Sequence, residues 1–134
     1  MKGDLPLVVW AGRWSVSRLA PDAPIPEWAT RRSELTVVAR SSEELSIVAP
    51  ESDVPDDVVG ERGFRVIKIE GPIPFQATGV IASFATPLAS AGIAIFPFST
   101  YDTDYVLVRE TDLSRAVDTL RLAGWNVKQQ ARRP

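Results

Sequence analysis

The chain has 134 residues, of which 45% are hydrophobic, and its 15 basic and 17 acidic residues give a formal charge of −2. A chain of this length buries roughly two thirds of the surface that its unfolded form exposes, which predicts a soluble globular protein. The basic residues are scattered, which argues against a nucleic-acid-binding protein. No apolar stretch reaches the ~18 residues of a membrane span and no signal-peptide pattern is present, so we expect a cytoplasmic protein.

Histidine and cysteine are both absent from the sequence. Their absence excludes Ser-His-Asp and Cys-His catalysis and removes the ligands that zinc prefers. Carboxylate, lysine or hydroxyl chemistry remains open, but there is no Gly-rich phosphate loop, no G-x-S-x-G motif and no calcium-loop spacing. We therefore expect a non-catalytic protein with no metal and no cofactor.

The first half of the chain is predicted to contain strands and little helix. A strand is expected over residues 14–19, followed by a short helical stub over 26–30. Two further strands are expected within 35–51, where a Ser-Ser pair and an acidic turn separate two apolar runs. Residues 50–63 are acidic and rich in Pro and Gly, which is typical of a surface connection.

The second half begins with a strand and a helix. Residues 64–69 alternate apolar and basic side chains, which predicts a half-buried strand. From residue 78 the apolar positions take helical spacing, and Gly92 follows where such a helix usually ends. Pro87 lies inside this pattern, and because an interior proline costs about 3 kcal/mol, we expect a kink or a break there.

Two strands, a second helix and a last strand complete the pattern. The strands are expected over 93–98 and 105–108, the helix after a cap at Thr111 or Asp112, and the last strand over 125–127. The order strand, helix, strand, strand, helix, strand predicts an α+β, ferredoxin-like fold. In that fold two helices cover one face of an antiparallel sheet.

The two halves share a sequence plan. Residues 35–51 and 93–110 both read as a strand, a hydroxyl pair, an acidic turn and an apolar strand. We predict two units in tandem, a degenerate one over 1–60 and a complete one over 61–134. The alternative is that two hairpins resemble each other by chance. The four tryptophans, at positions 10, 14, 28 and 125, are expected in the core or at a dimer interface.

Residues 78–108, TGVIASFATPLASAGIAIFPFSTYDTDYVLV, resemble the core of an ACT domain, a small regulatory module that binds amino acids. The most specific pieces are the sequences TGVIA at 78–82, PLA at 87–89 and STYxxD at 99–104. Within the superfamily, the segment is most similar to the aspartate-kinase-like branch that includes the cytosolic arginine sensors. The family often carries Pro-Leu-Ala near the end of its first helix, which accounts for Pro87.

The resemblance implies a ligand site between paired domains, near the loop before the first helix and the start of the following strands. The candidate ligand-binding residues are Gln76, Thr78, Gly79, Val80, Ser99, Thr100, Tyr101 and Asp104. A glycine at a helix start allows close approach of a ligand, and the first N–H groups favour a carboxylate. The alternative is that Thr78 caps the helix and Gly79 relieves crowding.

The turn at 99–104 also has two interpretations. Asp104 would pair with a cationic ligand group, while Asp102 and Thr103 would be turn residues. The alternative is that the whole segment is an ordinary polar turn, since Asp, Thr and Ser favour turns. The corresponding residues 41–44 of the first half lack the aromatic side chain, which argues against a second equivalent site.

The resemblance implies a homodimeric regulatory protein that binds an amino acid or a similar small metabolite and acts on an unidentified protein partner. A structural or adaptor module without a ligand is the alternative. An enzyme using the carboxylates of Glu70, Asp102, Asp104 and Glu110 is a third and weaker hypothesis, because no catalytic motif accompanies them.

Overall fold

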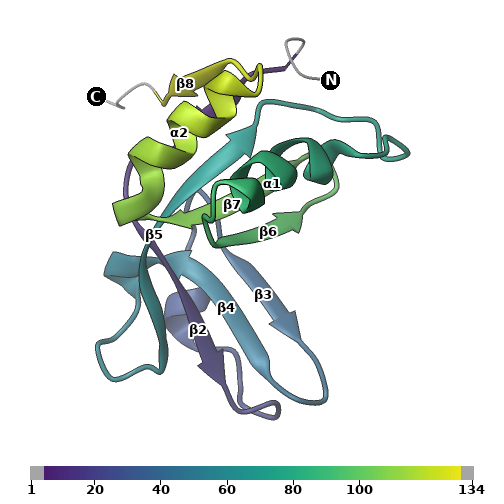
Figure 1. Ribbon diagram of the computed structural model, residues 1–134. Helices are drawn as coiled ribbons and strands as arrows, with labels where there is room; N and C mark the ends of the chain where they lie inside the picture. The colour runs from purple at the N-terminus through teal and green to yellow at the C-terminus, as the bar shows by residue number, and fades with distance from the viewer. Residues whose placement is uncertain (1–4, 131–134) are drawn as a thin grey trace. The chain divides into compact units, whose positions relative to one another are not determined.

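The computed structural model describes residues 5–130 and shows a mixed α+β architecture (Figure 1). The chain forms two compact units. The small unit contains residues 12–64, and the large unit contains the described residues 5–11 together with 65–130. This division differs from the expected cut after residue 60, because the N-terminal segment joins the C-terminal unit.

The N-terminal segment joins the large unit through strand β1 (Leu7–Val9), whose three residues are all apolar and all buried. The strand pairs antiparallel with β5 (Gly60–Ile69) on one side and parallel with β8 (Val127–Gln129) on the other. A strand paired on both edges and buried on its faces belongs to the interior of a sheet. We did not predict this strand from the sequence.

The large unit confirms the predicted ferredoxin-like order. Its elements are the second part of β5, α1 (Val80–Ser90), β6 (Ile95–Ser99), β7 (Asp104–Arg109), a short 3₁₀ turn η3 (Glu110–Asp112), α2 (Leu113–Leu122) and β8. Its strands lie in the order β6-β7-β5-β1-β8. The inserted β1 makes one pair of the sheet parallel, where the sequence predicted antiparallel pairs throughout.

Helices α1 and α2 both pack on one face of this sheet (Figure 1). The buried residues of the two helices are Val80, Phe84, Leu88, Ala116, Val117 and Leu120. They contact sheet residues that include Ile67, Ile69, Val106 and Val108. The i, i+3, i+4 spacing that predicted these helices therefore marks the side chains that form the core.

Helix α1 continues through Pro87, so the expected break does not occur. A proline at position 87 leaves the carbonyl of Ser83 without its intrahelical donor. The indole Nε1–H of Trp125 donates to that carbonyl at 3.2 Å. Trp125 is buried and the bond is partly buried, so it replaces the missing one at a position where an orphaned carbonyl would be costly.

The N-cap of α1 is Gly79, with a backbone φ of +72°, and no side chain caps the helix. The expectation that Thr78 is the cap is therefore wrong. At the other end Gly92 has a φ of +74°, as its predicted place after the helix requires. Asp112 occupies the N-cap position of α2, but its carboxylate pairs with Arg115 at 3.2 Å and not with the helix N–H groups.

The small unit consists of β2 (Trp14–Leu19), β3 (Val37–Arg40), β4 (Leu45–Pro50) and the first part of β5, in the order β3-β4-β2-β5. Two 3₁₀ turns, η1 (Glu27–Ala29) and η2 (Glu51–Asp53), stand where the large unit has helices. The expected helical stub at 26–30 is thus present as η1. The expected connection at 50–63 is partly regular, since it contains η2 and the start of β5.

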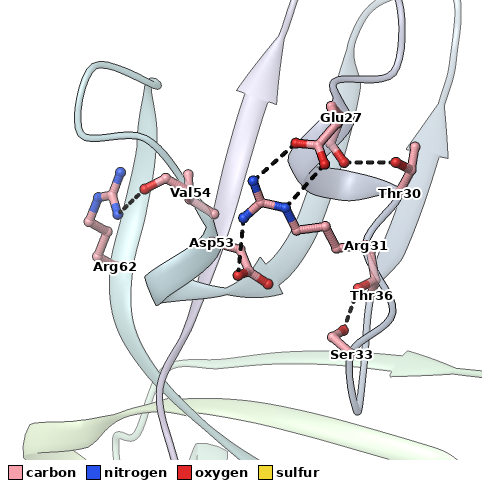
Figure 2. A network of polar contacts seen from close by, with 8 residues as sticks. All are labelled: Glu27, Thr30, Arg31, Ser33, Thr36, Asp53, Val54 and Arg62. Atoms are coloured by element: carbon pink, nitrogen blue, oxygen red, sulfur yellow. Dashed lines mark hydrogen bonds and ion pairs between the residues drawn. The ribbon is translucent and has the colours of Figure 1, made fainter.

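The two turns of the small unit are joined by Arg31 (Figure 2). Its guanidinium bonds the carboxylate of Glu27 at 3.0 Å and lies 3.6 Å from the carboxylate of Asp53. The hydrogen bond to Glu27 raises the pKa of Arg31 above its ordinary value. The small unit has its own apolar core, which consists of Ala29, Leu45, Ile47, Ala49 and Val54.

Three of the tryptophans, Trp10, Trp14 and Trp125, are buried, which confirms their expected place in the core. Trp28 is half-buried against the small unit's core. The indole N–H of Trp14 donates to the carbonyl of Leu35 at 3.1 Å, so its polar atom is satisfied. Among residues 5–130, no helix is long and apolar enough to cross a membrane.

Candidate functional site

The large unit contains a pocket of about 450 Å³ at the N-terminal end of α1. Three segments line it: residues of 73–77 before the helix, residues 79–82 of its first turn, and residues 99–104 between β6 and β7. The fold brings these segments together because α1 and the β6–β7 turn meet at one end of the sheet. We call this cavity the α1 pocket.

Six of the eight candidate residues line the α1 pocket: Gly79, Val80, Ser99, Thr100, Tyr101 and Asp104. Gln76 and Thr78 are not among its lining residues, and both are exposed. Sequence reasoning missed several apolar lining residues, among them Ile73, Phe75 and Ile81. The apolar run around Ile73 was a usable signal, because it directly precedes the predicted helix.

The first turn of α1 gives the pocket its hydrogen-bond donors. A Cβ built on Gly79 would meet no atom within 4 Å, so the glycine is required by its positive φ and not by crowding. The expectation that Gly79 relieves crowding is therefore wrong. The N–H groups of a helix's first turn have no intrahelical partner, and the first-turn residues Val80, Ile81 and Ala82 line the pocket. This end of the helix favours a carboxylate or another anion.

The rim of the pocket carries two exposed aromatic rings. Phe75 is 73% exposed and Tyr101 is 81% exposed, and their ring centroids lie 5.5 Å apart. Each ring comes from a different lining segment. Large apolar side chains gathered at a pocket mouth are typical of a surface that is covered by a ligand or by another chain.

The charged groups among the lining residues are all acidic. The pocket contains Asp102 and Asp104 and no lysine or arginine. Asp104 is half-buried, and its Oδ1 accepts a hydrogen bond from the hydroxyl of Ser99. The second carboxylate oxygen has acceptor capacity for a cationic group, which an ammonium or a guanidinium would match.

The lining segment 99–104 is also a well-bonded turn. The amide of Thr100 donates to the carbonyl of Thr103 at 2.9 Å, and the hydroxyl of Thr103 donates to the carbonyl of Ile69 at 2.7 Å. The segment can therefore be a polar turn at some residues and a candidate ligand contact at others, so the two interpretations from the sequence do not exclude each other. Thr103 bonds to the backbone, as a turn residue does, while the side chain of Tyr101 is exposed at the rim of the pocket.

The other carboxylates considered as catalytic groups lie outside the pocket. Glu70 pairs with Lys68 at 3.5 Å, and Glu110 lies 3.9 Å from Arg65. In the part of the chain that the structure describes, no three acidic side chains are grouped so as to hold a metal ion. In the small unit, the turn corresponding to 99–104 is closed by the hydroxyl of Ser41, which accepts from the amides of Glu43 and Glu44 at 3.1 and 3.2 Å.

The sequence is similar to two family models and to several known proteins. A family model described as an ACT domain matches residues 59–121, and a model described as an N-terminal domain matches residues 12–57. The cytosolic arginine sensors for mTORC1, subunit 1, of Rattus norvegicus and Homo sapiens are each 34% identical to this chain over 59 residues. That match covers 43% of this chain and 18% of the sensors, so the chain spans less than a fifth of these relatives.

Solved structures show the same fold over nearly the whole chain. A protein from Agrobacterium tumefaciens is 34% identical, with a TM-score of 0.89 over 97% of this chain and 96% of its own. The regulatory subunit of aspartate kinase from Thermus thermophilus is 13% identical, with a TM-score of 0.56 over 90% of this chain and 94% of its own. At that identity the second likeness bears on the fold alone.

Proposed function

Because a family model described as an ACT domain matches residues 59–121 of this chain, we propose that it is a non-catalytic regulatory protein whose α1 pocket binds an amino acid or a similar small metabolite with a cationic group. The observation that carries the proposal is the composition of the pocket. It combines the N-terminal turn of a helix with two carboxylates and no basic side chain.

This composition suits a zwitterion with an additional positive charge. The ligand's carboxylate would lie at the N–H groups of α1, where the helix dipole is favourable. Its cationic side chain would pair with Asp104. Arginine is the first candidate, because its planar guanidinium matches a carboxylate and stacks on aromatic rings such as Phe75 and Tyr101, and because the curated relatives are named arginine sensors.

We also infer that the chain is a homodimer and that the α1 pocket lies at the interface between two copies. The exposed rings of Phe75 and Tyr101 support this, since a second copy would cover them. The small unit would be a degenerate second copy of the fold, because its strands follow the order of the corresponding strands in the large unit. We place the chain in the cytoplasm on the ground that the curated relatives are named cytosolic.

Regulation by such a module requires two packing states with different affinity for the ligand. Ligand binding would shift the population between them and so change the affinity for a protein partner. An adaptor module without a ligand is the competing function. The two differ in one respect that is easy to measure, which is whether one small molecule binds saturably.

The test is a thermal-shift and calorimetric screen against the twenty amino acids. A ligand at 100 times its Kd stabilises the folded protein by about 2.7 kcal/mol, which is readily seen as a shift in Tm. We expect arginine to produce the shift and Asp104→Asn to abolish it, since the amide keeps the shape but not the charge. The matched control is Asp118→Asn, at an exposed acid of α2 outside the lining of the α1 pocket. No shift with any amino acid would favour the adaptor module.

A further inference from the structure

The α1 pocket is built from two segments that are neither helix nor strand. The segment 70–79 precedes α1, and the segment 100–103 joins β6 to β7. Neither is held along its length by a sheet ladder or by helix hydrogen bonds. The position of Phe75 and of Tyr101 therefore depends on how the two segments are fixed to each other.

Two hydrogen bonds and one close-packed contact at Gly71 fix the two segments to each other, and Thr103 takes part in one of the bonds and in the packing. Its hydroxyl donates to the carbonyl of Ile69, the last residue of β5, at 2.7 Å, and the residue is only 5% exposed. The neighbouring carbonyl of Asp102 accepts the amide of Ile73 at 2.7 Å. These two bonds join the turn to the residues on both sides of Gly71.

Gly71 shows how closely the two segments approach. A Cβ at this position would lie 3.1 Å from the carbonyl oxygen of Asp102 and 3.3 Å from the Cβ of Thr103. A side chain at position 71 would require these neighbouring atoms to move by a few tenths of an ångström. The contact is therefore both hydrogen-bonded and close-packed.

Thr103 also holds the candidate ligand-binding residues of the turn in place. The carbonyl of Thr103 accepts the amide of Thr100 at 2.9 Å and lies 3.3 Å from the Thr100 hydroxyl. Tyr101 lies between these two residues, and Asp104 follows Thr103 directly. A displacement of Thr103 would thus move an aromatic ring and a carboxylate of the pocket together.

We propose that Thr103 is a positioning residue of the α1 pocket: its buried hydroxyl ties the β6–β7 turn to the end of β5, and this holds Tyr101 and Asp104 opposite the start of α1. The proposal rests on the proposed function, since it assigns a role in ligand binding to a lining residue outside the eight candidate ligand-binding residues. Thr103 itself would not touch the ligand through its hydroxyl, because that group is already bonded to the main chain.

The first variant is Thr103→Val, which keeps the side chain's shape and removes the hydroxyl. Its conservative partner is Thr103→Ser, which keeps the hydroxyl. The matched control is Thr119→Val on α2, where a threonine hydroxyl donates to the Arg115 carbonyl at the same distance of 2.7 Å but outside the pocket. Two quantities are measured for each protein: the Kd for arginine by calorimetry, and the hydrogen-exchange rate of the Ile73 amide by NMR.

Thr103→Val is expected to weaken arginine binding by about tenfold and to speed exchange of the Ile73 amide by about the same factor, which is typical for the loss of one buried hydrogen bond. Thr103→Ser should remain within about threefold of wild type in both quantities. Thr119→Val should change neither. A merely structural role of Thr103 would lower the Tm of Thr103→Val while leaving its Kd for arginine unchanged.

Failure of this inference is distinguishable from failure of the proposed function. If wild type binds arginine and Thr103→Val binds it equally well, the inference is wrong. If wild type binds none of the twenty amino acids, the proposed function fails, and the exchange rate of the Ile73 amide decides the inference: an unchanged rate in Thr103→Val overturns it, and a faster rate supports it. Should Thr103→Val not fold, Gly71→Ala tests the same contact with the hydroxyl intact, and unchanged exchange at Ile73 would overturn the inference.

Discussion

At the scale of single residues, Pro87 lies inside helix α1, where a residue from another part of the chain replaces the hydrogen bond that proline does not make. Its position inside an apolar helical pattern was visible, and so was the expected loss of one hydrogen bond. The replacement donor, the indole of Trp125, lies 38 residues further along the chain (125 − 87) and comes close only in the folded protein.

A double-mutant cycle tests this accommodation. Trp125→Phe keeps the aromatic ring and removes the donor, leaving the Ser83 carbonyl unsatisfied, so we expect the free energy of unfolding to fall by about 1–3 kcal/mol. In a Pro87→Ala background the amide of residue 87 is available to the same carbonyl, and the cost of Trp125→Phe should be clearly smaller. Urea denaturation of the four proteins gives both values. Equal costs in the two backgrounds would show that the indole bond does not compensate for the proline.

At the scale of elements, periodicity located the two helices and most strands, with ends that differ from the structure by at most four residues. The predicted strand over 64–69 starts at Gly60 in the structure, and the predicted strand over 93–98 is found at Ile95–Ser99. Such shifts are expected, because element ends depend on pairing partners that a local pattern does not contain. Strand β1 was missed for a related reason: residues 5–11 form a short continuous apolar run without alternation, and periodicity alone does not identify such a run as a strand.

The burial of β1 gives a second prediction. Leu7 is 1% exposed, so Leu7→Ala should lower the free energy of unfolding by about 2–5 kcal/mol, through lost burial and the cavity left behind. Leu122→Ala is the matched control, since Leu122 is 90% exposed and its truncation should change stability by less than about 0.5 kcal/mol. Chemical denaturation followed by tryptophan fluorescence measures both. Equal effects would mean that β1 is not part of the large unit's core in solution.

At the scale of the whole molecule, the family resemblance carried more information than the residue pattern. The pattern supported a ferredoxin-like order, and the resemblance pointed to the end of α1 and the STYxxD turn as one site. The structure does bring Gly79, Val80, Ser99, Thr100, Tyr101 and Asp104 into one pocket. Gln76 and Thr78 were included by proximity in the sequence, which does not determine whether a loop residue faces a pocket or the solvent.

The proposed dimer gives the third prediction. Phe75 and Tyr101 are the exposed rings of the α1 pocket, so replacing both with serine should shift the protein from dimer toward monomer by removing apolar interface area. Leu122→Ser, at an equally exposed apolar residue outside the pocket, should leave the association unchanged. Sedimentation equilibrium over a range of concentrations gives the dissociation constants. A monomeric wild type, or a double variant that dimerises normally, would place the interface elsewhere or exclude it.

Two properties of this protein follow from residue type and short-range periodicity. The absence of histidine and cysteine excludes Ser-His-Asp and Cys-His catalysis, and the apolar spacing indicates which helix faces are buried. Three others were visible only in the folded chain: which unit the N-terminal strand joins, how Pro87 is accommodated, and that Thr103 bonds the two segments of the α1 pocket. Each of these is a contact between residues far apart in the chain, and such contacts depend on packing that no local pattern encodes.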